Sequence, residues 1–293
     1  GAVAEALGYY FDIEGNDVFY NNHSDDEAVR YKWLFGDGQE SEQVNPRHSF
    51  EKAGAYETCL IAYRENAQDT LCLEVGIQGV QSISPTYASS TGPALLTLFG
   101  YGFEEGSSVR LVQGSREIIA HSDNFHNTYK MEAYFRFERA PEGLYDVVVT
   151  HPSKANDTLK SAFSIQSPKE HDIRLSINGP ERVLINRPTK YSIAYRNNGN
   201  TMAVGVPVFI TVSPDREPKI LSTVSDENVL PEILEETPNS HFYMVKDSLT
   251  GDSVLLAALI IPYITPGTTG FIDLEVTSRI LNPYDIEVKA GAP

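Results

Sequence analysis

The amino-acid sequence predicts an all-β protein that folds as several small β-sandwich domains. No segment shows a sustained apolar period of 3.6 residues, the repeat that an amphipathic helix requires. Turn-forming residues recur about every ten residues, which is the spacing expected between sandwich strands. Several segments alternate between apolar and polar residues, as half-buried strands do, and residues 56–63 are the clearest example. Hydrophobic residues make up 41% of the 293, so folded cores are expected.

The most informative segment is the run from Trp33 to Gly38, with the sequence WLFGDG. Trp33 and Phe35 are two residues apart, so on a strand both side chains face the same side and are buried there. Gly36 and Gly38 permit the positive-φ conformations of a tight turn. The carboxylate of Asp37 can accept hydrogen bonds from the turn amides. This run therefore predicts a strand that ends in a hairpin turn.

Three further pieces surround this turn in a fixed order. Residues 18–24 predict an early strand and turn, and residues 46–50 carry His48 in a core or turn-bonding position. Residues 56–63 predict a strand that begins with Tyr56. Together with the WLFGDG turn they resemble the PKD domain, over residues 8–79. The resemblance implies an immunoglobulin-like sandwich with a non-catalytic role in adhesion, spacing, or glycan and protein contact. It implies no particular ligand.

The chain has two cysteines, Cys59 and Cys72, and both lie in this segment. If residues 64–68 form a hairpin loop, the two cysteines are nearly opposite each other on adjacent antiparallel strands, about 4.5–5.5 Å apart at Cα. They then point away from the face that carries Tyr56, Leu60, Leu71, Leu73 and Val75. We expect a disulfide that stabilises the domain by about 2–3 kcal/mol and indicates an oxidising compartment. Two reduced thiols in a cytosolic protein are the alternative.

A second unit is expected over residues 80–167. In its second strand, Gly100 and Gly102 permit a sharp turn that lets Phe103 pack back into the core. This Gly-Tyr-Gly-Phe piece, with Ser-Pro near the start and PEGLY at residues 141–145, resembles the IPT/TIG domain. That family is an immunoglobulin-like sandwich of surface receptors and of DNA-binding transcription factors, and the charge of this chain argues against the second use.

A third unit is expected over residues 168–293, and it resembles CARDB-like bacterial immunoglobulin-like modules. The resemblance rests on a Tyr-x-Ile-x-Tyr strand, an Asn- and Gly-rich turn and a following apolar strand. Further strands are expected at residues 173–177, 191–195, 206–212 and 269–276. Residues 228–236 could form a short helix, in which Pro231 is tolerated only near the start. The chain is thus predicted to hold three tandem immunoglobulin-like β-sandwich domains in an elongated arrangement, with boundaries 1–79, 80–167 and 168–293.

The composition is acidic, with 40 acidic and 23 basic residues and a net charge of -17. Nucleic-acid binding needs a basic face, so a nucleic-acid partner is excluded, and an anionic membrane surface is disfavoured for the same reason. The longest apolar stretch, Val254 to Ile264, is interrupted by Pro262 and is too short to span a bilayer. We therefore predict no membrane insertion within this chain.

The sequence contains no recognised catalytic motif. It has no Gly-x-Ser-x-Gly elbow, phosphate loop, dinucleotide fingerprint or His-Glu-x-x-His helix. His121, Asp123 and His126 are close together and could ligate a metal, but their spacing matches no recognised zinc site. We predict no catalytic residue, no enzyme activity and no bound cofactor.

Calcium is the one ion that the sequence makes plausible. The candidate ligands are carboxylates near the N-terminus, and Ca²⁺ prefers such hard oxygen donors. They are Asp12, Glu14, Asp17, Asp25 and Asp26. Their spacing is not that of an EF-hand loop, and solvated acids on turns are the alternative.

Tyrosines are a further candidate for a binding face, because sugar-binding and protein-binding surfaces favour them. The chain has 16 tyrosines, among them Tyr9, Tyr10, Tyr20, Tyr63 and Tyr101. The alternative, that these side chains cover the core or a neighbouring domain, remains open at this point.

We therefore interpret the chain as a non-enzymatic, extracellular segment of a bacterial cell-surface protein, monomeric and part of a larger chain. It would act in adhesion or as a spacer that presents interaction faces to a protein or glycan. The alternatives are a carbohydrate-binding module for polysaccharide capture, and the stalk of a larger secreted enzyme or toxin.

Overall fold

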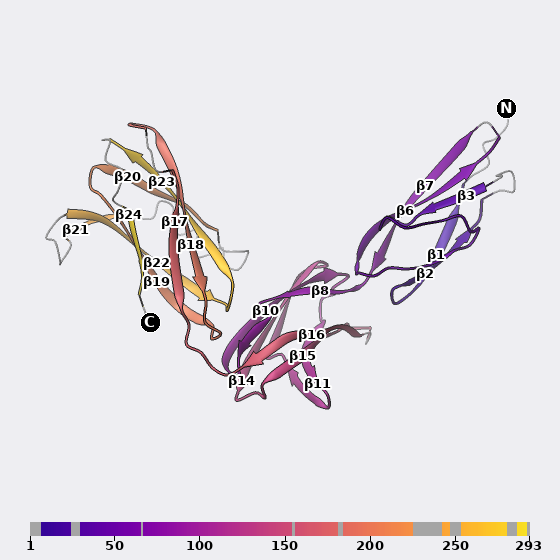
Figure 1. Ribbon diagram of the computed structural model, residues 1–293, viewed down its shortest axis with the longest axis horizontal. Helices are drawn as coiled ribbons and strands as arrows, with labels where there is room; N and C mark the ends of the chain where they lie inside the picture. The colour runs from indigo at the N-terminus through magenta and orange to yellow at the C-terminus, as the bar shows by residue number, and fades with distance from the viewer. Residues whose placement is uncertain are drawn as a thin grey trace. The chain divides into compact units, whose positions relative to one another are not determined.

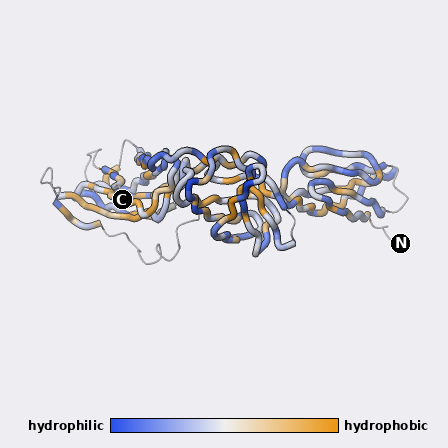
Figure 2. The backbone as a smooth tube through the Cα atoms, turned by 90° about the horizontal axis from the view of Figure 1, so that it is seen from below, coloured by the Kyte–Doolittle hydropathy of each residue, from blue (hydrophilic) through white to orange (hydrophobic). Residues whose placement is uncertain are grey.

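The structure is a computed structural model that describes residues 7–24, 30–65, 67–153, 156–180, 184–224, 242–246, 253–279 and 286–291. All regular secondary structure within these ranges is β-strand, which confirms the predicted all-β fold of tandem immunoglobulin-like sandwiches (Figure 1). Apolar and polar residues alternate along many of the strands (Figure 2). In these same ranges no helix is long and apolar enough to cross a membrane. The helix considered at residues 228–236 lies outside the described residues.

The strands of the N-terminal part form two antiparallel sheets, with the orders β1-β2-β5 and β4-β3-β6-β7. Their bounds are β1 Tyr9–Glu14, β2 Asp17–Asn22, β3 Arg30–Leu34, β4 Glu40–Ser41, β5 Arg47–Ser49, β6 Gly54–Tyr63 and β7 Gln68–Ile77. The buried residues that form their common core are largely aromatic. They are Tyr9, Val18, Tyr20, Trp33, Phe35, Phe50, Leu60, Val75 and Ile77.

The strands of the central part form two further sheets, with the orders β13-β14-β10-β8 and β12-β11-β15-β16-β9. Their bounds are β8 Gly79–Ser84, β9 Tyr87–Ser89, β10 Thr91–Tyr101, β11 Ser108–Gln113, β12 Arg116–Ile119, β13 Ser122–Asn127, β14 Lys130–Glu138, β15 Gly143–Thr150 and β16 Asn156–Gln166.

The strands of the C-terminal part form the sheets β17-β18-β23-β20 and β21-β22-β19-β24. Their bounds are β17 Ile173–Asn178, β18 Pro188–Asn197, β19 Ala203–Val212, β20 Arg216–Val224, β21 Tyr243–Lys246, β22 Ser253–Ile264, β23 Thr269–Ser278 and β24 Ile286–Ala290. Their core is mostly aliphatic, and Tyr195 is the one aromatic member among its described buried residues. Its other members are Ile193, Ala203, Val206, Val208, Ile210, Val212, Ile261, Ile264, Ile272, Leu274 and Val276.

The chain forms two compact units. The first spans residues 1–86, 95–135 and 144–164, and the second spans residues 87–94, 136–143 and 165–293.

Candidate functional site

The Gly-Asp-Gly turn adopts the backbone geometry that its residues allow. Gly36 and Gly38 have φ angles of 87° and 90°, in the left-handed region that glycine tolerates best. A Cβ atom at Gly36 would lie 2.7 Å from the carbonyl oxygen of Glu57, so a side chain there would collide with β6. The Gln39 amide donates a 3.0 Å hydrogen bond to Oδ1 of Asp37. The turn is therefore fixed both by its conformation and by its carboxylate.

The second oxygen of the same carboxylate connects the turn to strand β5. Oδ2 of Asp37 lies 2.7 Å from Nε2 of His48, and both side chains are largely buried. The His48 ring stacks on Phe35 with the ring centres 4.0 Å apart, and its edge meets Phe50 at 4.6 Å. His48 thus joins the turn to the aromatic core, which is a structural role.

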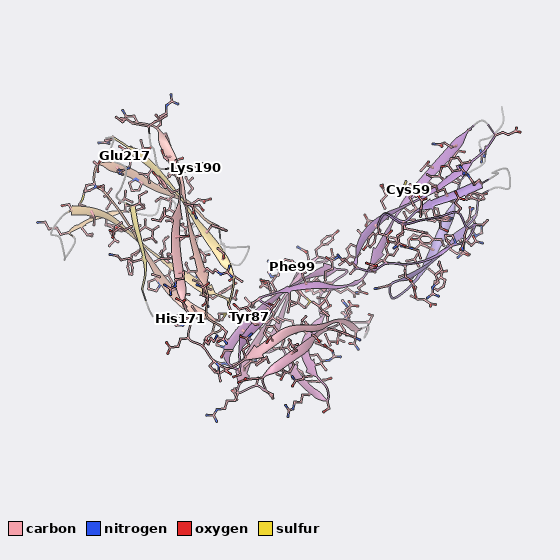
Figure 3. The ribbon with its side chains drawn as sticks, viewed as in Figure 1. Cys59, Tyr87, Phe99, His171, Lys190 and Glu217 are labelled. Carbon is pink, nitrogen blue, oxygen red and sulfur yellow. A yellow bond between two sulfur atoms is a disulfide. The ribbon has the colours of Figure 1, made fainter. Side chains whose placement is uncertain are left out.

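A disulfide joins Cys59 on β6 to Cys72 on β7, as the sequence predicted (Figure 3). The two strands pair in antiparallel register with the cysteines directly opposite each other, and their Cα atoms are 4.0 Å apart. The hairpin pairs Tyr63 with Gln68, so Gln68 belongs to β7 and not to the loop, which was predicted to span residues 64–68.

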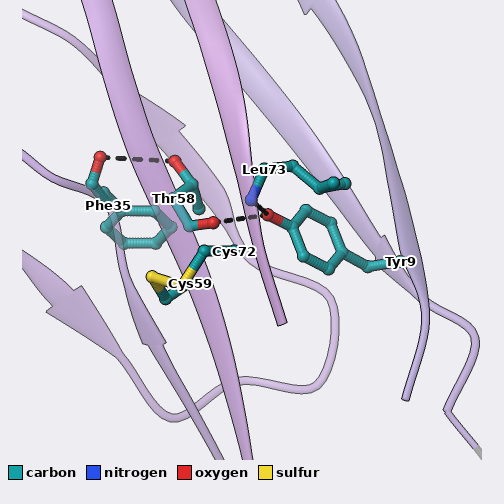
Figure 4. The surroundings of a disulfide bond; sticks show 6 residues. All are labelled: Tyr9, Phe35, Thr58, Cys59, Cys72 and Leu73. Atoms are coloured by element: carbon teal, nitrogen blue, oxygen red, sulfur yellow. Dashed lines mark hydrogen bonds between the residues drawn. A yellow bond between two sulfur atoms is a disulfide. The ribbon is translucent and has the colours of Figure 1, made fainter. Parts of the chain in front are cut away.

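The hydroxyl group of Tyr9 lies beside this disulfide, between the backbones of two paired residues (Figure 4). It donates to the carbonyl oxygen of Thr58 at 2.5 Å and accepts from the amide of Leu73 at 3.1 Å. Thr58 and Leu73 face each other on β6 and β7. Burial raises the pKa of Tyr9 to about 12, because the phenolate would lose its hydration. The strand pair next to the disulfide is thus bridged by a side chain from β1.

The other predicted core residues of this part differ in burial. Trp33 is fully buried and donates from Nε1 to the Gln43 carbonyl at 3.0 Å. Tyr56 is half-buried and stacks on Phe50 at 4.1 Å. Leu73, which alternation assigns to the apolar face, is 37% exposed. Alternation fixes the face on which a side chain lies, but not whether the opposite sheet covers it there.

The candidate calcium ligands that the structure describes lie on the paired strands β1 and β2. Asp12 and Glu14 lie on β1, and Glu14 faces Asp17 on β2. Asp17 accepts hydrogen bonds from Ser49 and from Arg47, which lower the pKa of its carboxyl group, the serine contributing most. Asp25 and Asp26 lie outside the described residues. The described part of the chain contains no cluster of three His, Cys, Asp or Glu side chains that could hold a metal ion.

In the central part, the glycines named from the sequence lie where the chain turns at the end of β10. Gly102 has a φ angle of 79°, and a Cβ atom at Gly100 would collide with the Gly79 carbonyl oxygen. Phe103 is fully buried directly after this turn. Both glycines are therefore required by conformation or by close backbone approach.

Sequence reasoning missed a buried Ser-His-Asp series in the same unit. Ser107 Oγ lies 3.2 Å from Nδ1 of His151, and Nε2 of His151 lies 2.6 Å from Oδ2 of Asp157. Serine and histidine meet because Ser108 and Thr150 are paired neighbours on β11 and β15. The Ser107 hydroxyl is enclosed and also lies 3.4 Å from the Glu104 amide, so this arrangement is a satisfied polar network rather than an exposed nucleophile.

The three residues considered as metal ligands each make a separate contact. Asp123 accepts from the Val109 amide at 3.2 Å, whereas Nε2 of His126 lies 3.1 Å from Oε2 of Glu132 on β14. The ring of His121 packs edge-on against Tyr134. The structure therefore does not bring the three together, and it reveals Glu132 and Asn124 as contacts of His126.

The family comparison assigns the N-terminal part. A PKD domain model matches residues 12–75. A solved structure of the PKD1 domain from the Vibrio cholerae metalloprotease PrtV is 30% identical to this chain. The match covers 26% of this chain and 98% of that one, with a TM-score of 0.24. The N-terminal part of this chain belongs to the PKD domain family.

Two other solved structures are similar to the chain. The PKD1 domain of Vibrio anguillarum Epp is 28% identical over 26% of this chain and 94% of its own, with a TM-score of 0.24. A Bacteroides ovatus protein, SGBP-B of a mixed-linkage glucan utilization locus in complex with a mixed-linkage heptasaccharide, is 9% identical. That match covers 89% of this chain and 93% of the other, with a TM-score of 0.26. No curated protein matches this chain.

Proposed function

We propose that this chain is a non-catalytic segment of an extracellular bacterial surface protein. It acts in adhesion, or as a spacer that presents interaction faces. The observation that carries the proposal is the PKD domain with its disulfide between Cys59 and Cys72. PKD domains are non-catalytic modules, and a disulfide persists in an oxidising compartment outside the cytosol. The acidic composition also favours a soluble surface over nucleic-acid contact.

We propose further that two more sandwich domains follow, an IPT/TIG-like domain over residues 80–167 and a CARDB-like domain over residues 168–293. The strand pairing supports these boundaries. The described strands β8–β16 share sheets with one another, and β17–β24 do the same. Small sandwiches of this kind each fold around their own core, which suits a series of spacing modules.

The proposal is tested by labelling intact cells of the source organism with an antibody raised against this chain. Surface labelling before lysis, with both cysteines resistant to a maleimide until a reductant is added, is the expected result. Labelling that requires lysis, together with free thiols in freshly prepared protein, would contradict it. Release of product from polysaccharide or peptide substrates by the purified chain would contradict the non-catalytic role.

A further inference from the structure

One outer face of the central part carries an unusual group of aromatic side chains. On β10, Phe99 and Tyr101 alternate with the buried Leu98 and Gly100, so both rings lie on the face away from the core. Phe99 is 42% exposed and projects from the strand (Figure 3). Tyr129 is 55% exposed, and its ring meets Tyr101 edge to face at 5.5 Å. The Tyr101 ring is half-buried, and its hydroxyl lies 3.4 Å from a carboxylate oxygen of Glu74 on β7. Phe99 and Tyr129 are therefore the exposed rings of this group, which we call the aromatic platform.

A row of polar side chains lies next to the platform. This polar row consists of Lys130 and Glu132 on β14 and His126 on β13. Lys130 and Glu132 are on the outward side of β14, yet they are only 6% and 8% exposed. Oε2 of Glu132 lies 3.1 Å from His126, and Oε1 lies 3.8 Å from the Lys130 ammonium. Among the described residues, no donor makes a hydrogen bond to Oε1 of Glu132. This oxygen is itself enclosed, so a ligand can reach the polar row only through His126, whose side chain is 30% exposed.

The pairing of strands places the polar row beside the platform. The Gly100 amide donates to the Tyr129 carbonyl at 3.0 Å, so Phe99 lies next to Lys130 across the strands. His126 lies on β13, the other neighbour of β14. Adjacent strands are about 4.8 Å apart, so the polar row and the platform together span the length of roughly two sugar rings.

The charges and the size of this surface select the kind of ligand. The negative charge of Glu132 is balanced by Lys130, so the surface favours a neutral ligand over an ion. Two exposed aromatic rings are far less than the roughly 800 Å² per partner of a typical protein interface. Flat apolar rings beside hydrogen-bonding groups match the C–H faces and hydroxyl groups of a saccharide.

We propose that this face binds a neutral polysaccharide, with sugar rings stacked on Phe99 and Tyr129. His126 supplies a hydrogen bond to a ligand hydroxyl. Glu132 is a positioning residue: its carboxylate and the Asn124 side-chain amide both contact Nε2 of His126, which leaves Nδ1 for the ligand. This inference goes beyond the proposed function, because a spacer needs no ligand.

The test is affinity gel electrophoresis of the intact chain through gels that contain a soluble β-glucan, a xylan, a galactomannan or an α-glucan. Alginate serves as the anionic comparison. At least one neutral polysaccharide should retard the chain, and Phe99→Ala and Tyr129→Ala should each weaken retardation about tenfold. The matched control is Phe271→Ala, because Phe271 is also 42% exposed but lies on β23, in the other compact unit. It should leave the retardation unchanged.

Several results would overturn the proposal. They are no retardation by any of the four neutral polysaccharides, retardation by alginate alone, or equal losses in the Phe271→Ala control. His126→Ala should lower affinity at an unchanged melting temperature, and His126→Gln should restore part of it. Equal loss in both His126 variants would remove His126 from the site. Cell-surface labelling is independent of these measurements, so failure here would leave the proposed function intact.

Discussion

The N-terminal and C-terminal sandwiches fill their cores in different ways. The PKD core is built around Tyr9, Tyr20, Trp33, Phe35 and Phe50, and a disulfide lies beside it. The core of β17–β24 consists mainly of isoleucine, valine and leucine, and residues 168–293 contain no cysteine. Aromatic rings with hydroxyl or N–H groups need hydrogen-bond partners when they are buried, whereas aliphatic side chains need only to fit.

This difference determines how each core specifies its strand pairing. In the PKD domain, the hydroxyl oxygen of Tyr20 lies 3.2 Å from the hydroxyl oxygen of Thr58. The Thr58 hydroxyl in turn donates to the Phe35 carbonyl at 3.3 Å. Directional bonds therefore tie β2, β6 and the end of β3 to one another. The aliphatic core relies on close packing of β-branched side chains on strands of matching register. A single substitution should consequently cost more in the PKD core.

The largest expected effect comes from Trp33→Ala. Loss of this fully buried ring should lower the free energy of unfolding of the PKD domain by about 3–5 kcal/mol, because a large cavity remains. Ile210→Val in the aliphatic core is the comparison, and it should cost about 0.5–1.5 kcal/mol. Calorimetry with near-ultraviolet circular dichroism measures both. Comparable costs for the two variants would remove the distinction between the cores.

The next effect is that of the disulfide. Replacing both Cys59 and Cys72 by alanine should cost about 2–3 kcal/mol, because the bond closes a short loop in the unfolded chain. Trp33 is the only tryptophan in the chain, so its fluorescence during urea unfolding reports on the PKD domain alone. A reductant should shift the wild-type midpoint by a similar amount and leave the double variant unchanged. A shift of the double variant by reductant would mean that the agent acts elsewhere.

The third effect concerns the Tyr9 hydroxyl. Tyr9→Phe leaves the Thr58 carbonyl and the Leu73 amide without this partner, which should cost about 1–3 kcal/mol. Because the folded-state pKa is raised from 10.0 to about 12, folding favours the protonated phenol. Its contribution is therefore fully present below pH 10 and is lost as the pH rises toward 12.

Fluorescence-monitored unfolding between pH 8 and 12 tests this directly. Tyr9→Phe should reduce the alkaline loss of stability without abolishing it, since burial also raises the pKa of Tyr20 to about 12. Tyr10→Phe is the control, because that ring is exposed. An unchanged alkaline profile in Tyr9→Phe would show that another group is responsible.

The features that the sequence could predict are those set by local rules. The Gly36–Gly38 turn follows from backbone conformation, and the pairing of Cys59 with Cys72 follows from the length of one hairpin loop. The strands of the later units were expected from alternation, although their ends extend further than predicted. Strand β18, for example, runs from Pro188 to Asn197, where residues 191–195 were expected.

The features that could not be predicted depend on contacts between distant segments. The Tyr9 hydroxyl bonds to Thr58 and Leu73, which are 49 and 64 positions further along the sequence. Ser107 meets His151 only through the pairing of β11 with β15. The burial of Glu132 on an outward face was equally inaccessible, because alternation predicts such a residue to be solvated. The candidate saccharide site rests on this last kind of contact, and Phe99 and Tyr129 were not among the tyrosines and core residues singled out from the sequence.

The smallest expected effect concerns a carboxylate with little support from hydrogen bonds. Asp17 accepts from two side chains and its pKa is lowered, whereas Asp123 accepts from the Val109 amide and desolvation raises its pKa from 3.8 to about 6. Folding therefore favours the protonated form of Asp123. Stability from this group is present below about pH 4 and is lost as the pH rises through 6.

Asp123→Asn keeps an acceptor for the Val109 amide but carries no charge. It should raise the free energy of unfolding of the first unit at pH 7.5 by about 1 kcal/mol or less, because the carboxylate is partly solvated and its cost is screened. At pH 4 the variant and the wild type should agree. A variant that is less stable than the wild type at pH 7.5 would contradict this prediction. The Val109 amide would then stabilise the charged form of Asp123 as well as Ser49 and Arg47 stabilise that of Asp17.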